Sequence, residues 1–344
     1  MKRLILSTCI CCLICIHASL YSQTKEASKD SAVNKEKSWK IFGSIYGGFY
    51  HKWPSTYSSQ KSGFEFKTGI LGFKNQFNEK VDATIMFDVS KTTRDIKNKY
   101  DTATISYTEG NNYTAYLKQA DIHWKINQYA ELSLGMLLSS QYLLTQDKFW
   151  DHRYIEYTFQ ESSKYGYPAD FGARLKLYPT EKISVSMNML NGDGPARWQD
   201  DHYTFLYAGD IEYRQSDNLI FRIYGDCKQA PHKSQKNQSV FDGFVGYVYK
   251  NIKIGGEFSF IHNVNFLSRN IQGWSAYAIY KFKKKFELLA RYDFFQDVIL
   301  YKNSQYLIAG IQYEPAKNYF LSVNFRNSQP ISTPQLYINF GARF

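Results

Sequence analysis

Residues 336–344 read LYINFGARF, and this stretch decides the fold class. Apolar side chains occupy every second position: Leu336, Ile338, Phe340, Ala342 and Phe344. A two-residue period predicts a strand with one apolar face and one polar face. Barrels of the bacterial outer membrane usually end on such a strand, because the last strand closes the ring. The ending therefore predicts a strand whose apolar face meets lipid and whose polar face, with Tyr337, Asn339 and Arg343, meets water.

The same alternation recurs through the chain. Residues 319–325 and 183–189 place apolar side chains on one face and mostly polar side chains on the other. Segments of roughly 9–13 residues, about the length that crosses a membrane when tilted, begin near sixteen positions. These are Trp39, Gly63, Val81, Thr114, Ala130, Ala169, Lys182, Thr204, Asn218, Val240, Ile252, Asn270, Phe286, Ser304, Asn318 and Gln335.

The connections between these segments alternate strictly between long and short. The short ones contain turn residues typical of tight hairpins and cover 77–80, 127–129, 179–181, 215–217, 251, 283–285 and 314–317. The long ones cover 51–62, 91–113, 139–168, 191–203, 228–239, 263–269, 296–303 and 328–334. This pattern is typical of a transmembrane antiparallel β-barrel with short periplasmic turns and long external loops. The sequence thus predicts an all-β barrel of about sixteen strands.

The start of the chain predicts export. Residues 1–22 combine a charged start, a modest apolar run and small residues near their end, as in a secretory signal peptide. Residues 23–38 are polar and charge-mixed, which predicts a disordered periplasmic tail, and residues 39–344 remain for the barrel. Cleavage after Ser22 leaves Cys227 as the one cysteine, so no internal disulfide is expected. Aromatic residues make up 17% of the chain, which suits the aromatic girdles of a barrel.

The charge balance limits which binding partners the sequence predicts. The formal net charge is +11, but export and the absence of a compact basic helix or RNA-binding motif argue against nucleic acid. An anionic solute, or the anionic lipid of the outer membrane, is the better partner for the excess charge. The strand residues assigned to the lumen by alternation have nearly equal numbers of acidic and basic side chains, so the excess lies in loops, turns and the tail. A polar inner face in a ring of this size predicts a water-filled lumen.

The longest connection, residues 139–168, is too aromatic for a loop that only moves in solvent. Its middle, residues 145–157, reads TQDKFWDHRYIEY. We predict that it folds into the lumen, packs its aromatic side chains on the wall and narrows the pore. Lys148, His152 and Arg153 would then face the solute path. The alternative is a loop that packs over the barrel mouth or against a neighbouring subunit.

Several stretches together resemble a known family. They are residues 169–173 (ADFGA), 191–194 (NGDG), 149–155 (FWDHRYI) and 71–74 (LGFK). The chain resembles the phosphate-selective porin O and P family over most of its length after the signal peptide. The resemblance implies a sixteen-stranded homotrimeric outer-membrane porin with an inward third long loop and a basic lumen that binds anions. The third long connection of this chain is 139–168.

The sequence therefore predicts an outer-membrane porin that lets small hydrophilic solutes diffuse passively, with a phosphate-like anion preference as a further possibility. Arg153, Arg174 and Arg222 are the candidate anion contacts, because a guanidinium suits bidentate binding of an oxyanion. One alternative is a closed structural or adhesive barrel that acts through its external loops. A hydrolase is a weaker alternative, based on His123 and Asp121 on one predicted face; no catalytic motif, metal-ligand spacing or cofactor motif occurs.

Overall fold

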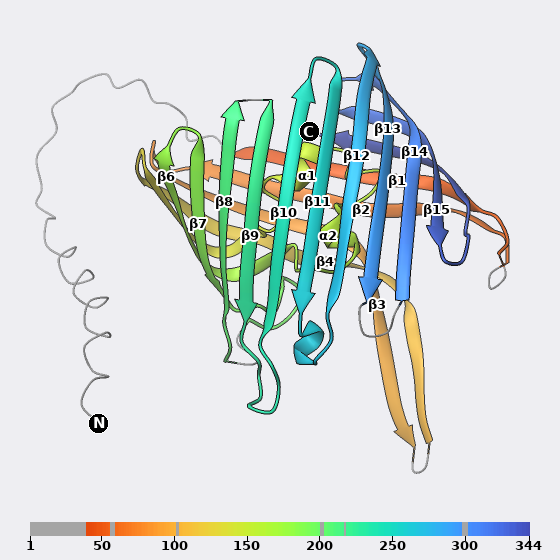
Figure 1. The fold of residues 1–344 in the computed structure, drawn as a ribbon, viewed down its shortest axis with the longest axis horizontal. Coiled ribbons are helices and arrows are strands. Elements are labelled where there is room, and N and C mark those ends of the chain that lie inside the picture. Colours follow the sequence, from red (N-terminus) through yellow and green to blue (C-terminus); the bar gives the residue numbers. More distant parts are fainter. Residues whose placement is uncertain (1–38, 56–58, 101–102, 200–202, 217, 298–301) are drawn as a thin grey trace, which may run out of the picture. The chain divides into compact units, whose positions relative to one another are not determined.

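The computed structural model describes residues 39–55, 59–100, 103–199, 203–216, 218–297 and 302–344. The predicted signal peptide (1–22) and tail (23–38) lie outside these residues. The described chain forms sixteen strands and three short helices (Figure 1). The strands are β1 (Lys40–Lys52), β2 (Lys61–Gln76), β3 (Val81–Tyr100), β4 (Ala103–Asn127), β5 (Ala130–Leu138), β6 (Ala169–Thr180), β7 (Ile183–Leu190), β8 (Leu206–Ser216), β9 (Leu219–Lys228), β10 (Gln238–Tyr249), β11 (Ile252–His262), β12 (Ile271–Lys283), β13 (Phe286–Asp297), β14 (Lys302–Ala316), β15 (Tyr319–Gln329) and β16 (Gln335–Arg343).

The sheet is a closed antiparallel barrel in which each strand pairs with its neighbours in sequence and β1 pairs with β16. The closing register sets Ser44 opposite Arg343 and Lys52 opposite Gln335. Closure pairs the backbone groups of both end strands, which is the condition for a sheet to cross a bilayer. The predicted all-β barrel is confirmed, and fifteen of the sixteen strands begin within two residues of the predicted positions.

The exception is the connection predicted at 91–113, which is wrong. There β3 and β4 continue to pair, from Lys91 opposite Tyr113 to Tyr100 opposite Ala103, and form a long hairpin (Figure 1). The sequence of this stretch is polar, which suggested a loop. It also contains β-branched and aromatic residues at 103–108 (ATISYT), and these favour extended backbone and cross-strand pairing.

The predicted short turns are stabilised by side chains that accept hydrogen bonds from nearby backbone N–H groups. The Asn78 side chain accepts hydrogen bonds from the N–H groups of Lys80 (2.8 Å) and Val81 (2.9 Å). The Asn127 side chain accepts one from Tyr129 N–H at 2.8 Å. Such bonds let an Asn replace a backbone turn contact, which is why it recurs in tight hairpins.

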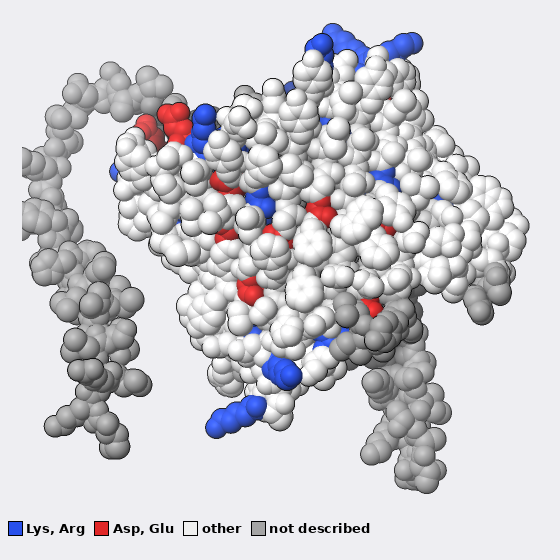
Figure 2. Space-filling view, viewed as in Figure 1, with Lys and Arg blue, Asp and Glu red and all other residues white. Residues whose placement is uncertain are grey.

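The two faces of the strands follow the predicted alternation. In β16, Ile338 and Phe340 are 46% and 40% exposed on the outside, while Tyr337 and Asn339 are buried on the inside. Figure 2 shows one outer face, on which Lys and Arg side chains protrude at the two ends while uncharged residues cover most of the middle. The outside therefore suits lipid, and the inner face is polar.

Residues 139–168 contain two short helices, α1 (Gln146–Trp150) and α2 (Phe159–Ser162). Aromatic side chains from this stretch, here called the inner segment, pack against inward-facing wall residues; the buried cluster includes Trp150 and Tyr154 with Tyr46, Tyr277 and Phe320. Inward-facing glycines provide room for these rings. A Cβ added at Gly246 would lie 2.7 Å from the Phe149 ring, and one at Gly341 would lie 2.9 Å from Tyr154 Cβ.

No helix in the described part of the chain is long and apolar enough to span a membrane.

The contact at Gly246 gives a testable consequence for packing. We expect Gly246→Leu to lower the free energy of unfolding in detergent by about 1–3 kcal/mol, because the new side chain overpacks the site of Phe149. Gly243→Leu is the matched control in the same strand, since a Cβ there meets nothing within 4 Å. The control should change stability by no more than about 0.5 kcal/mol. Equal effects of the two substitutions in denaturant titrations would show that the inner segment does not pack on Gly246.

Candidate functional site: the lumen and the inner segment

Basic side chains from the barrel wall hold the inner segment by its backbone. Each donates hydrogen bonds to carbonyl groups of the segment, and together they lie on strands β2, β9, β13, β15 and β16. The bonds run from Lys67 to Ile155 O (2.6 Å), Arg222 to Gln141 O (2.6 Å), Arg291 to Tyr157 O (2.5 Å), Arg326 to Ile155 O (2.9 Å) and Arg343 to Asp151 O (3.0 Å). These strands are spread around the ring, so the segment lies across the barrel interior.

Charged side chains of the segment pair with the same wall. Glu156 accepts from Arg326 at 2.9 Å and lies 3.7 Å from Lys67. Asp151 pairs with Arg343 at 2.6 Å, although this pair is half exposed to water. The buried pairs are the stronger restraints, because breaking one leaves an unpaired charge away from water.

The inner segment is also braced internally. Arg153 makes a two-pronged contact with Glu161, with both N···O distances at 2.6 Å, and pairs with Asp147 at 3.0 Å. Its guanidinium lies 4.5 Å from the centre of the Tyr157 ring. Burial alone would lower the pKa of Arg153, but Glu161 and Asp147 raise it well above its usual value. Arg153 is therefore a fixed positive charge bonded to its own segment.

The remaining predicted site residues have different surroundings. His152 is buried, with its ring nitrogens 2.7 Å from Trp150 O and 3.1 Å from Glu287. Arg174, on β6, donates hydrogen bonds to the Asn188 side chain and to the carbonyl of Leu138, the residue just before the segment. Arg222 also lies 3.4 Å from Asp210, whereas Lys148, on α1, is exposed. All five predicted site residues lie in the segment or bond to it or to the residue just before it. Their contact with a solute stays a prediction.

The two-residue alternation of the sequence places Lys67, Arg291, Arg326 and Arg343 on the inner face, but no feature of the sequence predicts that they anchor the segment. Each anchor contacts residues between 88 and 192 positions away in sequence. A strand pattern specifies the face of a side chain, and it contains no signal for which distant carbonyl the side chain will meet.

The hydrogen bonds, ion pairs and ring contacts of the inner segment are spread over most of the wall. They reach β1, β2 and each strand from β7 to β16. On the inner faces of β3 to β6, charged side chains nearer the short turns are partly exposed: Asp82, Asp121, His123, Glu131 and Lys176. Farther from these turns, the charged side chains of Asp88, Lys118, Asp170 and Arg174 are buried. The His123 ring lies 3.5 Å from Asp82 and 3.4 Å from Glu131, so its partners differ from the predicted Asp121.

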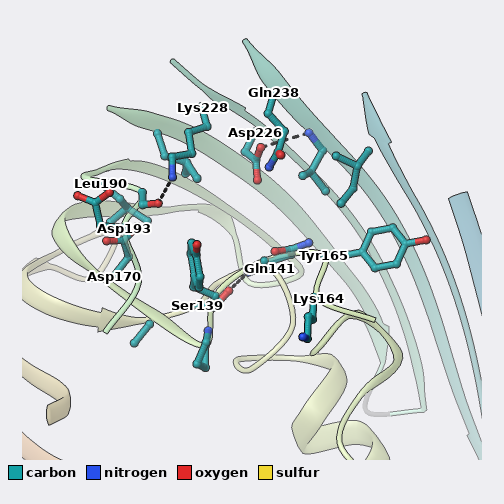
Figure 3. Close-up of a pocket in the computed structure, with 18 of the residues that line it drawn as sticks. Ser139, Gln141, Lys164, Tyr165, Asp170, Leu190, Asp193, Asp226, Lys228 and Gln238 are labelled. Atoms are coloured by element: carbon teal, nitrogen blue, oxygen red, sulfur yellow. Dashed lines mark hydrogen bonds between the residues drawn. The ribbon is translucent and has the colours of Figure 1, made fainter. Parts of the chain in front are cut away.

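A cavity of about 510 Å³ lies between the end of the inner segment and strands β6 to β11. Figure 3 shows Asp170, Asp193 and Lys228 on one side of this cavity and Gln141 and Tyr165 on the other. Lys228 donates a hydrogen bond to Gly192 O. No group of three or more His, Cys, Asp or Glu side chains among the described residues is arranged to hold a metal ion.

The anchor at Glu156 predicts a response to acid. Burial would raise the pKa of the Glu156 carboxyl, but Lys67, Arg326 and Arg291 outweigh burial and hold this pKa at about 2, below its usual 4.5. The ionised carboxylate therefore stabilises the bound segment above about pH 4.5, and this stabilisation is lost as the pH falls towards 2. We expect single-channel current noise to rise over that interval. Glu156→Gln should show, already at neutral pH, the raised current noise that the natural chain shows in acid, and the noise should not rise further on acidification. Current noise that changes with neither the acid nor the substitution would contradict this role.

No protein-family model and no curated protein matches the chain. Solved structures do match. OmpF from Salmonella typhi, in complex with daunomycin, has a TM-score of 0.65 and 12% identity, over 89% of this chain and 97% of that one. OprB from Pseudomonas putida at high pH has a TM-score of 0.67 and 8% identity, over 90% and 94%. An anion-selective porin from Comamonas acidovorans has a TM-score of 0.62 and 10% identity, over 90% and 100%.

At these identities the likeness shows the fold. The chain has the sixteen-stranded barrel fold of outer-membrane porins. In this fold bacterial outer-membrane proteins cross the bilayer with their strands, and the apolar outer face described above fits that location.

Proposed function

We propose that the protein is a channel of the bacterial outer membrane through which small hydrophilic solutes diffuse passively. The main supporting observation is the combination of a closed sixteen-stranded ring, apolar outside and polar inside, with partly exposed charged side chains on the inner faces of β3 to β6 near the short turns. A ring of this width encloses an aqueous channel unless something fills it. Outer-membrane lipid is the partner of the apolar outer face.

The proposed solute path follows the inner faces of β3 to β6. There inner charges of both signs near the short turns, such as Asp82, Glu131 and Lys176, are partly exposed, whereas the wall from β7 around to β2 bonds the segment. Lys148 is the proposed solute contact on the segment, because it is exposed. His152, Arg153, Arg174 and Arg222 are proposed to set the width of the constriction by holding the segment in place.

Cysteine modification tests this path. Ser133 on β5 lies opposite His123 in the register, whereas Ser275 on β12 is 2% exposed beneath the segment. In a Cys227→Ser background, we expect a charged thiol reagent to lower the conductance of Ser133→Cys markedly. Ser275→Cys is the matched control and should not respond. A response at Ser275→Cys alone would place the path on the opposite wall.

A homotrimer and an anion preference are finer proposals. The resemblance to the phosphate-selective porin O and P family implies both, and one structural neighbour, OmpT of Vibrio cholerae, is described as a trimer form. The basic wall side chains Arg291 and Arg326 are bonded to protein acceptors, which weakens the case for a phosphate-binding lumen. The reversal potential in a salt gradient, with and without phosphate, decides the sign of the preference.

A closed structural or adhesive barrel is the second candidate. It is favoured by the packing of the inner segment, whose Tyr142, Tyr154 and Ile155 side chains are fully buried. Swelling of liposomes in isotonic sugars separates the two proposals. The channel predicts swelling that slows with sugar size, and the closed barrel predicts none. N-terminal sequencing of the exported protein would test the proposed cleavage after Ser22.

A further inference from the structure

The short-turn end of the barrel has an excess of positive charge on one side of the ring. Lys283, Lys284 and Lys285 lie where β12 ends and β13 begins, and all three are exposed. The turns after β10 and β14 add Lys250 and Lys317, which are also exposed. Figure 2 shows Lys and Arg side chains protruding from the upper edge, where the turns after β10 and β12 lie in Figure 1. These five lysines are here called the basic rim.

The charge of the basic rim is not balanced by neighbouring acids. Among the described residues, no lysine of the basic rim forms an ion pair; the nearby Glu287 pairs instead with Lys281, at 3.8 Å. Glu314, near the end of β14, accepts a hydrogen bond from Asn318 N–H at 3.0 Å. On the opposite side of the ring, each turn lysine follows an acid directly, in the pairs 79–80 and 181–182, which both read EK. The excess charge is therefore local to β10 to β15.

The lysines of the basic rim are close enough to act on one partner. Lys285 donates a hydrogen bond to Pro315 O at 2.8 Å, so the turns after β12 and β14 are in contact. Successive turns are two strands apart, a spacing of about 10 Å, which is similar to the Debye length in physiological salt. The fields of the five ammonium groups therefore overlap, and an anionic surface beside them is attracted by the whole group.

Aromatic rings on the outer face lie directly beside the basic rim. The three consecutive lysines are flanked by Phe282 and Phe286, whose ring centres are 5.8 Å apart, and Phe286 lies 4.7 Å from the Tyr313 ring. The Lys250 ammonium lies 5.1 Å from the centre of the Tyr249 ring, which is 51% exposed. Aromatic girdles of membrane barrels lie at the level of the lipid headgroups. The basic rim is therefore at headgroup level in the leaflet on the side of the short turns, which is the periplasmic leaflet.

We propose that the basic rim binds the headgroups of anionic phospholipids in the periplasmic leaflet of the outer membrane. The rings fix the depth of the barrel in this leaflet, and the ammonium groups contact the headgroup phosphates as point charges. Each basic side chain near an anionic membrane surface adds to the attraction. A soluble acidic partner would also fit the charge, but it gives no role to the row of rings. This lipid site goes beyond the proposed channel and does not depend on conduction.

Two phospholipids with the same acyl chains test the proposal. Phosphatidylglycerol has a net negative charge, whereas phosphatidylcholine has none. Native mass spectrometry of the purified full-length protein in detergent measures the binding of each. We expect the protein to bind phosphatidylglycerol at least about tenfold more tightly than phosphatidylcholine.

A matched pair of triple variants locates the site. Lys250→Gln, Lys283→Gln and Lys284→Gln, combined, should remove most of the preference for phosphatidylglycerol. Lys285 is kept because its hydrogen bond joins two turns. The control removes the same number of positive charges from exposed lysines on the opposite side of the same end, by combining Lys80→Gln, Lys125→Gln and Lys182→Gln. It should leave the preference unchanged, and both variants should conduct like the natural chain.

The other outcomes overturn the proposal. Equal binding of the two lipids would do so, as would a preference that survives in the rim variant. A preference lost equally in both variants would show that net charge, and not the basic rim, attracts the lipid. If polyglutamate binds through the basic rim while phosphatidylglycerol gains no preference, the partner is a soluble acidic protein. Because conductance is measured separately, a failed lipid preference and a failed channel are distinguishable results.

Discussion

A variant whose residues 141–166 are replaced by a short Gly-Ser linker will conduct severalfold more current per channel than the natural chain. The two ends of the inner segment are adjacent, since Ser139 N–H donates to Pro168 O at 2.9 Å, so a short linker can join them. None of the sixteen strands is altered. The lumen then approaches the open width of a sixteen-stranded ring, which is too wide for side chains to fill.

The control for this deletion is a similar replacement in residues 231–236, which connect β9 and β10 at the same end of the barrel as the inner segment. That variant should conduct like the natural chain. Single-channel recording in planar bilayers measures both. If a folded deletion variant conducts no more than the natural protein, the inner segment does not form the constriction.

Arg326→Met will release the middle of the inner segment while leaving the barrel folded. Arg326 is 3% exposed, and it bonds Glu156, Ile155 O and Asn339, each at 2.9 Å. Removing one partner of a buried ion pair costs about 3–5 kcal/mol, because the other charge stays buried without its partner. Lys67, 3.7 Å from Glu156, can offset only part of that loss.

The expected readouts for Arg326→Met are faster amide hydrogen exchange in residues 150–160 and a noisier open-channel current. Lys176→Met is the control, because it removes a partly exposed inner-face cation on β6 that forms no ion pair with the segment in the described structure. Unchanged exchange in Arg326→Met would show that the segment is held without this anchor.

The barrel could be predicted from the sequence because its signals are local. Side chains alternate between the two faces of a strand, so the apolar pattern of residues 336–344 was enough to predict which side chains of β16 face outward and which face inward. The boundaries followed from turn residues such as Asn78 and Asn127. The hairpin at 91–113 was missed because a paired polar strand and a polar loop differ little in composition.

The interior could be predicted only in part. The aromatic character of residues 145–157 indicated packing, but α1 and α2 span five and four residues, too few to show a helical period. Arg222 was proposed as an oxyanion contact because its guanidinium can donate several bonds at once. The structure uses that same property to hold the carbonyl groups of Ser140 and Gln141. Donor geometry alone does not distinguish a solute from a distant stretch of the same chain.

The most direct test of the proposed channel is the current through the purified, folded protein in a planar lipid bilayer. A channel predicts stepwise increases in ion conductance as single proteins insert, with a conductance that rises in the 141–166 replacement. A correctly folded barrel that inserts into the bilayer and passes no ions would contradict it.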